Sequence, residues 1–138
     1  VINEIDLSNL FDLNKHPVSF MDDHTEHIPE YGSMIYTVWD SDDKFIYVGV
    51  GGVGKRKDPR SRINQHRNGG RSGDQFCVYI QDYFIIPDLL SKNHSKIQKG
   101  SLDKMTRDFI QKYLSYRFVI IKIIYLIIVI ILVIMKKE

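Results

Sequence analysis

The sequence predicts a small mixed α/β (α+β) domain, with a three-stranded antiparallel sheet flanked by helices. Residues 33–50 have the pattern of a β-hairpin, and residues 116–121 that of a further strand. Two other segments, 59–68 and 102–114, carry helical signals. At 138 residues, the chain is long enough for one such domain with a buried core.

Residues 1–31 are predicted to be an acidic N-terminal arm with little regular structure, apart from a short helix near Leu7–Leu13. Short apolar pieces alternate with acids there and show no sustained period. The stretch "HTEH", residues 24–27, lacks the glutamate position of the zinc hydrolase motif, so a solvated acidic loop is favoured over a metal site.

The strands are predicted from their β-branched and aromatic residues. "SMIYTVWD", Ser33–Asp40, and "KFIYVGV", Lys44–Val50, are separated by the polar "SDD" and form the hairpin. "FCVYIQDYF", Phe76–Phe84, has a similar composition and is also predicted to be extended. "YRFVII", residues 116–121, is the last predicted strand.

The two helices are predicted from different signals. Asp58 can cap a helix that Pro59 begins and Gly69-Gly70 end, which predicts a short basic helix from about Pro59 to Asn68. Apolar residues at helical spacing predict an amphipathic helix over Leu102–Leu114, preceded by a polar linker.

The charge of the chain is unevenly distributed although the net charge is only +2. Residues 1–46 hold ten acids and two bases, a balance of −8, whereas residues 47–138 hold seventeen bases and seven acids, a balance of +10. Seven basic residues between positions 55 and 71 face only one acid there, Asp58. Such a patch suits a polyanion such as nucleic acid, and a solvated face is the alternative. These residues are Lys55, Arg56, Lys57, Arg60, Arg62, Arg67 and Arg71.

Cysteine content and the N-terminal pattern predict a cytoplasmic protein. The single Cys77 cannot form an internal disulfide, and the N-terminal residues show no secretory signal pattern. A location in the reducing cytosol is therefore expected.

The glycine-rich stretch "YVGVGGVGKR" has two possible interpretations. Gly49–Lys55 has the spacing of a phosphate-binding P-loop, but Arg56 stands where that motif needs Ser or Thr. Nucleotide hydrolysis is therefore disfavoured. The alternative is that Gly49 ends a strand and the later glycines turn the chain into the basic helix.

A second group of residues favours phosphate chemistry. Tyr36 and Tyr47 lie on the predicted hairpin, and Arg62 and His66 are spaced i, i+4 on the basic helix. A phenol can relay a proton from water, a guanidinium can hold two phosphate oxygens, and an imidazole can assist proton transfer. Packing tyrosines and a solvated helix face are the structural alternative.

These residues give the chain a resemblance to the GIY-YIG nuclease family over about residues 32–121. The first signature strand is Met34-Ile35-Tyr36, with Met where glycine is usual, and the second is Tyr47-Val48-Gly49. The eleven-residue offset between the tyrosines is typical, and "RINQH", Arg62–His66, matches the family's arginine and histidine.

The resemblance implies hydrolysis of a DNA phosphodiester bond with one divalent metal, Mg²⁺ or Mn²⁺. Tyr47 or Tyr36 would then activate or orient the water, Arg62 would stabilise the charge on the phosphate, and His66 would assist proton transfer. The substrate would be double-stranded DNA, bound through its phosphate backbone, and nothing in the sequence indicates a base preference. The DNA contacts would be Lys55, Arg56, Lys57, Arg60, Arg67 and Arg71.

The chain departs from the family at the metal ligand, which the family places as a glutamate on a helix after the third strand. Residues 123–135 there read "IIYLIIVIILVIM", so the ligand stays unassigned, with Asp108 a substitute if the strand assignment is wrong. The tail, residues 122–138, has three interpretations. It is a membrane anchor within residues 118–135, a buried element, or the product of a frameshifted gene.

The sequence therefore predicts a GIY-YIG-type DNA endonuclease. The alternatives are a catalytically inactive DNA-binding module and a membrane-tethered protein whose hairpin is only structural.

Overall fold

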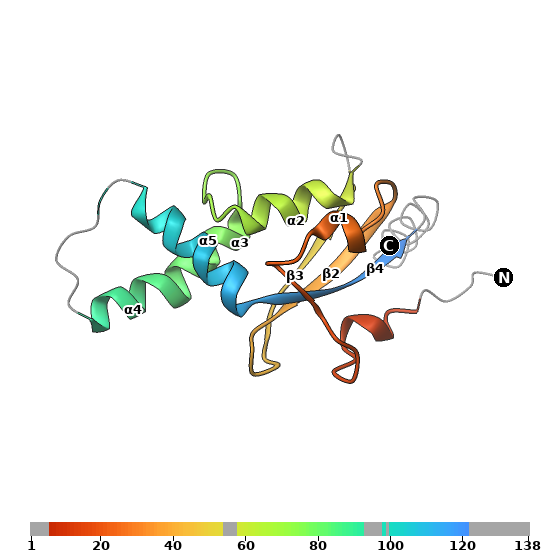
Figure 1. Cartoon of the computed structure of the whole chain (residues 1–138), viewed down its shortest axis with the longest axis horizontal. Helices are drawn as coiled ribbons and strands as arrows, with labels where there is room; N and C mark the ends of the chain where they lie inside the picture. The colour runs from red at the N-terminus through yellow and green to blue at the C-terminus, as the bar shows by residue number, and fades with distance from the viewer. Residues whose placement is uncertain (1–5, 54–57, 93–97, 99, 122–138) are drawn as a thin grey trace, which may run out of the picture.

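A four-stranded antiparallel sheet is the centre of the fold (Figure 1). The computed structural model describes residues 6–53, 58–92, 98 and 100–121. The strands lie in the order β1-β4-β2-β3. Their bounds are Val18–Ser19 for β1, Ser33–Trp39 for β2, Phe45–Gly51 for β3 and Ser115–Ile121 for β4. The predicted class is confirmed, and the short β1 is one strand more than the three predicted.

The register of the β2–β3 hairpin sets the side chains that share a face. Tyr36 pairs with Gly49 and Val38 pairs with Tyr47, so the two signature tyrosines point to the same side of the sheet. On the other edge of β2, Tyr36 pairs with Phe118 of β4. β2 is thus paired on both edges, and six of its seven residues are buried.

Helix α2, Pro59–Arg67, begins as the sequence predicts. The Asp58 carboxylate accepts a hydrogen bond from the Arg60 backbone N–H at 2.9 Å, and Pro59 occupies the first turn. At Gly51, an added Cβ would lie 3.2 Å from the Pro59 carbonyl oxygen. The absence of a side chain there lets α2 pack closely on β3.

The predicted strand at residues 76–84 is wrong, because the segment is helical. It comprises α3, Gln75–Ile80, and the π-helix η2, Gln81–Ile85, and it continues into α4, Ile86–Ser91. Asp74 caps α3 by accepting from the Phe76 N–H at 3.0 Å. Phe76, Cys77 and Ile80 are fully buried at helical spacing, so packing overrides the strand-like composition.

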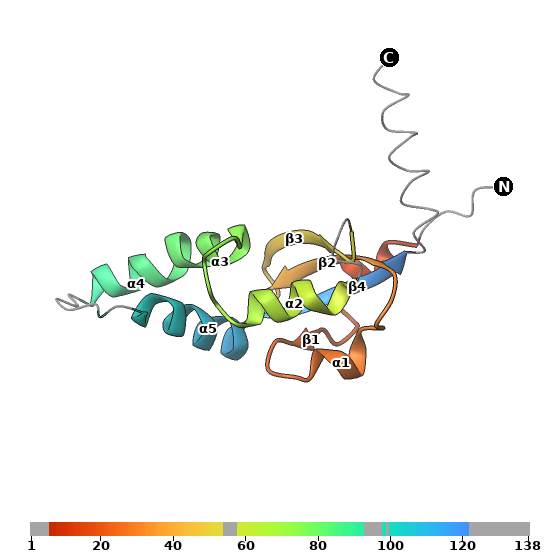
Figure 2. The ribbon, with the colours of Figure 1, turned by 90° about the horizontal axis from the view of Figure 1, so that it is seen from above.

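A helical hairpin extends away from the sheet (Figures 1 and 2). One arm is α3, η2 and α4, and the other is the predicted amphipathic helix, α5, Ser101–Tyr113. The second arm runs back antiparallel to the first and leads directly into β4. The name "helical hairpin" is used below for residues 75–92 and 100–113.

The N-terminal segment contributes to the core, in contrast to a loosely structured arm. It contains a 3₁₀ turn, η1, at Ser8–Leu10, and a short helix, α1, at His24–His27. Leu10, Phe20 and Ile28 are at most 2% exposed. Burial of large apolar side chains at this level is typical of a core.

The tail predictions lie outside the described residues, since they concern positions 122–138. Among the residues that the structure describes, no helix has the length and apolar character needed to cross a membrane.

Candidate functional site

The four predicted site residues come together where α2 packs on the sheet. The ring centroids of Tyr36 and Tyr47 are 6.4 Å apart, and those of Tyr36 and His66 are 5.6 Å apart. Tyr47 meets His66 edge-on at 6.1 Å. Arg62, one turn before His66, lies beside the Tyr36 hydroxyl and interacts with it.

Buried hydrogen bonds connect Tyr36, His66 and Asp74. The Tyr36 hydroxyl lies 2.5 Å from His66 Nε2, and His66 Nδ1 lies 2.6 Å from Asp74 Oδ2. All three residues have 0% of their surface exposed. The three are called the Tyr–His–Asp chain below.

The pKa shifts set the direction of the hydrogen bonds in this chain. Burial disfavours the charged form of Asp74, but hydrogen bonds from His66 and Cys77 outweigh it and lower the Asp74 pKa. Burial lowers the pKa of His66, although Asp74 opposes this shift. A neutral His66 therefore donates from Nδ1 to the Asp74 carboxylate and accepts at Nε2 from the Tyr36 O–H.

The Tyr36 hydroxyl keeps its proton and presents its oxygen to Arg62. Burial, followed by the nearby Tyr47, raises the pKa of Tyr36, while Arg62 opposes the rise. Because the Tyr36 proton is directed at His66, the free electron pairs of its oxygen are available to a guanidinium donor. The Tyr–His–Asp chain can thus hold the Arg62 side chain in place.

Gly49 is needed because the Tyr36 phenol lies directly over it. An added Cβ at Gly49 would lie 2.2 Å from the Tyr36 hydroxyl oxygen, far inside a normal contact distance. The glycine of the second signature segment therefore makes room for the first signature tyrosine. The prediction that Gly49 ends the strand is wrong, because β3 continues to Gly51, which pairs with Met34.

Exposure divides the site into an inner and an outer part. Tyr36 and His66 are fully buried, whereas Tyr47 and Arg62 are half-buried. Only the outer pair can contact a substrate directly. The sequence left open which tyrosine would meet the water, and the exposure of the two favours Tyr47.

Two of the predicted DNA-binding arginines are engaged elsewhere. Arg60 Nε donates to the Ile28 carbonyl at 2.6 Å, and its Nη2 donates to the Thr25 carbonyl at 3.2 Å. Arg67 Nη2 donates to the Met21 carbonyl at 3.4 Å. These guanidinium groups hold the N-terminal segment against α2, on a different side of the helix from Arg62.

The other predicted DNA contacts have different positions. Arg71 is exposed in the turn between α2 and α3. Lys55, Arg56 and Lys57 lie outside the described residues. The described part of the predicted basic surface is therefore smaller than its sequence suggests.

The described residues contain no cluster of metal-ligand side chains, and the single carboxylate that the resemblance implies stays unassigned. Over residues 6–53, 58–92 and 100–121, no group of three His, Cys, Asp or Glu side chains is placed to hold a metal ion. Asp74 is buried, and its oxygens accept from His66 and the Phe76 N–H. Asp108 is ion-paired with Lys104 at 2.7 Å on α5.

Asp74 is the site residue that sequence reasoning missed. An Asp immediately before an apolar segment is a helix-capping signal, and that signal was available. The prediction of a strand over residues 76–84 concealed it. The second role of Asp74, as partner of His66, depends on how α2 and α3 pack and has no local signal.

Comparisons with known proteins leave the family open. No protein-family model matches the chain, and neither a curated protein nor a solved structure shows significant similarity to it.

Proposed function

We propose that this chain is a DNA endonuclease of the GIY-YIG type that hydrolyses phosphodiester bonds with a divalent metal. The observation that supports it best is the clustering of Tyr36, Tyr47, Arg62 and His66. These residues come from two strands and a helix, and they meet through the β2–β3 register and the packing of α2. A cluster that only filled the core would not need the buried Tyr–His–Asp chain, because burying polar groups costs free energy unless they are hydrogen-bonded.

Arg62 and Tyr47 are the catalytic residues of the proposed reaction. The Arg62 guanidinium would bind two oxygens of the scissile phosphate and stabilise the charge that develops on them. The Tyr47 phenol would orient the attacking water and relay its proton. Both side chains are half-buried at the outer part of the site.

His66 is a positioning residue in this proposal. It is fully buried and contacts Tyr36 and Asp74, so it acts on the substrate only through its neighbours. Its neutral ring fixes the Tyr36 hydroxyl, and the Tyr36 oxygen in turn fixes Arg62. A side chain held in place before the substrate arrives loses less entropy in the transition state.

A divalent metal, when bound, would stabilise negative charge on the phosphate oxygens. No cluster of three ligand side chains is present among the described residues, and its ligand is unassigned. Arg62 and Arg71 remain as described phosphate contacts for double-stranded DNA, and binding should weaken steeply with salt.

The test is cleavage of supercoiled plasmid by the full chain with Mg²⁺ or Mn²⁺ and with a chelator. Arg62→Ala should lower the cleavage rate roughly 100- to 1,000-fold, as expected for loss of a donor to the developing charge. The matched control is Asn64→Ala, at an exposed position of the same helix. Unchanged cleavage in Arg62→Ala would contradict the proposal.

A second candidate function is that of an inactive DNA-binding module. Such a module would keep the fold and the basic residues Arg62 and Arg71 but would need no metal ligand. Folded protein that binds duplex DNA in a salt-dependent manner but cleaves no plasmid with either metal would replace the first proposal by this one.

A further inference from the structure

Five aromatic rings form a continuous series across the helical hairpin. Tyr83 stacks near Tyr79 with ring centroids 4.6 Å apart, and Tyr79 lies 6.3 Å from Phe84. Phe84 reaches across to Phe109 of α5 at 5.3 Å, and Phe109 lies 5.3 Å from Tyr113. The name "aromatic series" is used below for Tyr83, Tyr79, Phe84, Phe109 and Tyr113.

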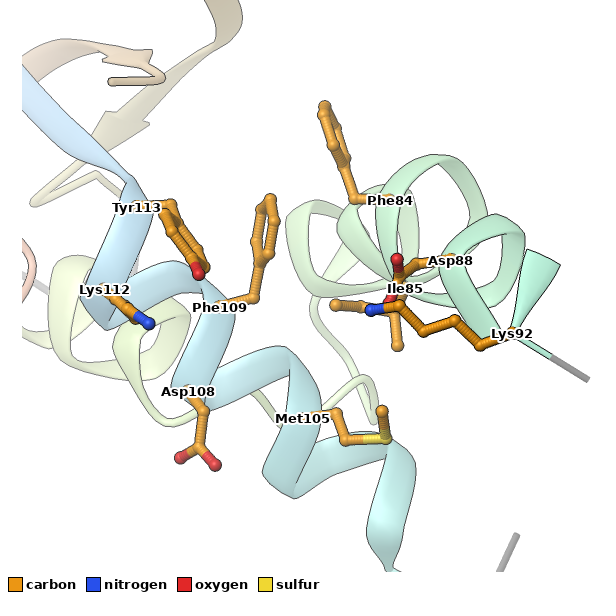
Figure 3. A pocket seen from close by; sticks show the side chains of 9 residues that line it. All are labelled: Phe84, Ile85, Asp88, Lys92, Met105, Asp108, Phe109, Lys112 and Tyr113. Atoms are coloured by element: carbon orange, nitrogen blue, oxygen red, sulfur yellow. The ribbon is translucent and has the colours of Figure 1, made fainter. Parts of the chain in front are cut away.

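A cavity of about 510 Å³ lies beside this series, between the two arms of the helical hairpin. Figure 3 shows Phe109 and Tyr113 on α5 facing Phe84 and Ile85 on the other arm. Met105 completes the apolar lining. This volume is within the range of roughly 300–1,000 Å³ that is typical of small-ligand sites.

The ends of the aromatic series are open to solvent. Tyr83 is 67% exposed and Tyr113 is 44% exposed. Lys112 Nζ lies 5.0 Å from the centre of the Tyr113 ring, beside the cavity. The π-helical turn η2 carries Tyr83 and Phe84, and such turns are rare and frequently occur at functional sites.

The helical hairpin has no net charge that would attract a charged ligand. Its described residues hold four acids and four bases. At the rim of the cavity, Asp88 is already paired with Lys92 at 2.8 Å. The hairpin therefore offers ring faces and balanced polar groups, which suit a neutral planar ligand better than a phosphate. The charged residues are Asp82, Asp88, Asp103, Asp108, Lys92, Lys104, Arg107 and Lys112.

We propose that the aromatic series binds unpaired nucleobases by stacking. A nucleobase is planar and neutral, and stacking on aromatic side chains is the sequence-tolerant way in which proteins bind single strands. This inference rests on the proposed function, because that function supplies a nucleic acid as ligand. It adds that the preferred substrate carries a single-stranded segment, whose bases lie on the hairpin.

The test is the binding of dye-labelled oligothymidylate, oligouridylate and a mixed-sequence duplex to the full chain in a chelator. Tyr113→Ala should weaken single-strand binding roughly 5- to 100-fold, the usual effect of losing one stacked base. Duplex binding should be unchanged. Tyr113→Phe keeps a ring and should bind like the unmodified protein.

The matched control is Tyr31→Ala, which removes a tyrosine that is 76% exposed and lies outside the aromatic series. Tyr83→Ala, at the other end of the aromatic series, should also weaken single-strand binding. This variant keeps the proposal testable if Tyr113→Ala unfolds the protein. A loss of affinity for either oligonucleotide, or for both, supports stacking. A loss with oligothymidylate alone indicates DNA as the source of the bases, and a loss with oligouridylate alone indicates RNA. Unchanged affinity in both alanine variants overturns the proposal.

This experiment separates the two proposals because binding in a chelator needs no cleavage. Ring-dependent binding without plasmid cleavage would remove the nuclease proposal and keep the stacking surface. Cleavage that depends on Arg62, together with binding that does not depend on the rings, would keep the nuclease proposal and remove the stacking surface.

Discussion

Two regions of this molecule use tyrosine in opposite ways. Tyr36, beneath α2, is fully buried and its hydroxyl is hydrogen-bonded to His66. Tyr83 and Tyr113, on the helical hairpin, are exposed and contact mainly other rings. The difference shows that burial and polar partners, and not the residue type, decide whether a phenol serves as a fixed polar group or as a stacking surface.

The two regions should also differ in their response to mutation. Removing one member of the buried Tyr–His–Asp chain leaves its partners unsatisfied, which costs far more than the hydrogen bond contributed. Removing an exposed ring leaves only solvent-accessible surface. Substitutions in the Tyr–His–Asp chain should therefore mainly lower the stability of the protein. Substitutions in the aromatic series should mainly lower ligand binding.

The largest effect is expected for Asp74→Ala. This change removes the hydrogen bond to His66 Nδ1 and the cap on the Phe76 N–H together. We expect the free energy of unfolding to fall by about 3 kcal/mol, from about 1 kcal/mol for the cap and about 2 kcal/mol for a buried bond to a charged group. Urea denaturation measures it.

Asp58→Ala is the matched control, since Asp58 caps α2 through the Arg60 N–H but, among the described residues, accepts no side-chain hydrogen bond from a histidine and affects His24 only at a distance. Its loss should be about 1 kcal/mol. Equal losses in the two variants would mean that the His66 contact contributes nothing, and the buried chain would then be only a helix cap.

Local signals were sufficient to predict β2, β3, β4 and α2, but not the short β1. The β-branched and aromatic composition of β2 and β3 and the Asp58-Pro59 start are properties of neighbouring residues, and the structure confirms the elements that they predict. The outcome shows that short-range patterns survive folding where packing agrees with them.

Elements whose structure depends on packing with distant parts of the sequence could not be predicted. The segment Phe76–Phe84 has the composition of a strand, but its apolar residues at positions 76, 77 and 80 are buried in the core as part of a helix. The N-terminal segment had no period, yet Phe20 and Ile28 enter the core because Arg60 and Arg67 hold its backbone. Tertiary contacts override weak local preference in both cases.

An intermediate effect on the free energy of unfolding is expected when the pH is lowered. Burial lowers the pKa of His66 in the folded protein, whereas in the unfolded chain it titrates near about 6.5. Below that pH the unfolded chain takes up a proton that the folded protein does not. The free energy of unfolding should therefore decrease by up to about 1.4 kcal/mol per pH unit as the pH falls.

His66→Gln isolates this contribution, because His24 also has a lowered pKa and adds a decrease of the same sign. The slope of the unfolding free energy between about pH 6.5 and pH 5 should be shallower in the variant by up to one proton. Parallel slopes for the variant and the unmodified protein would show that His66 is protonated in the folded state.

The smallest effect on stability is expected for Tyr83→Ala. Tyr83 is 67% exposed, and its closest ring contact is Tyr79 at 4.6 Å. Exposed substitutions usually change the free energy of unfolding by no more than about 0.5 kcal/mol, and urea denaturation should place this variant within that range. A loss of about 2 kcal/mol would mean that the ring is part of the packing of the helical hairpin. The aromatic series would then be a structural seam, and the contrast with the buried Tyr–His–Asp chain would disappear.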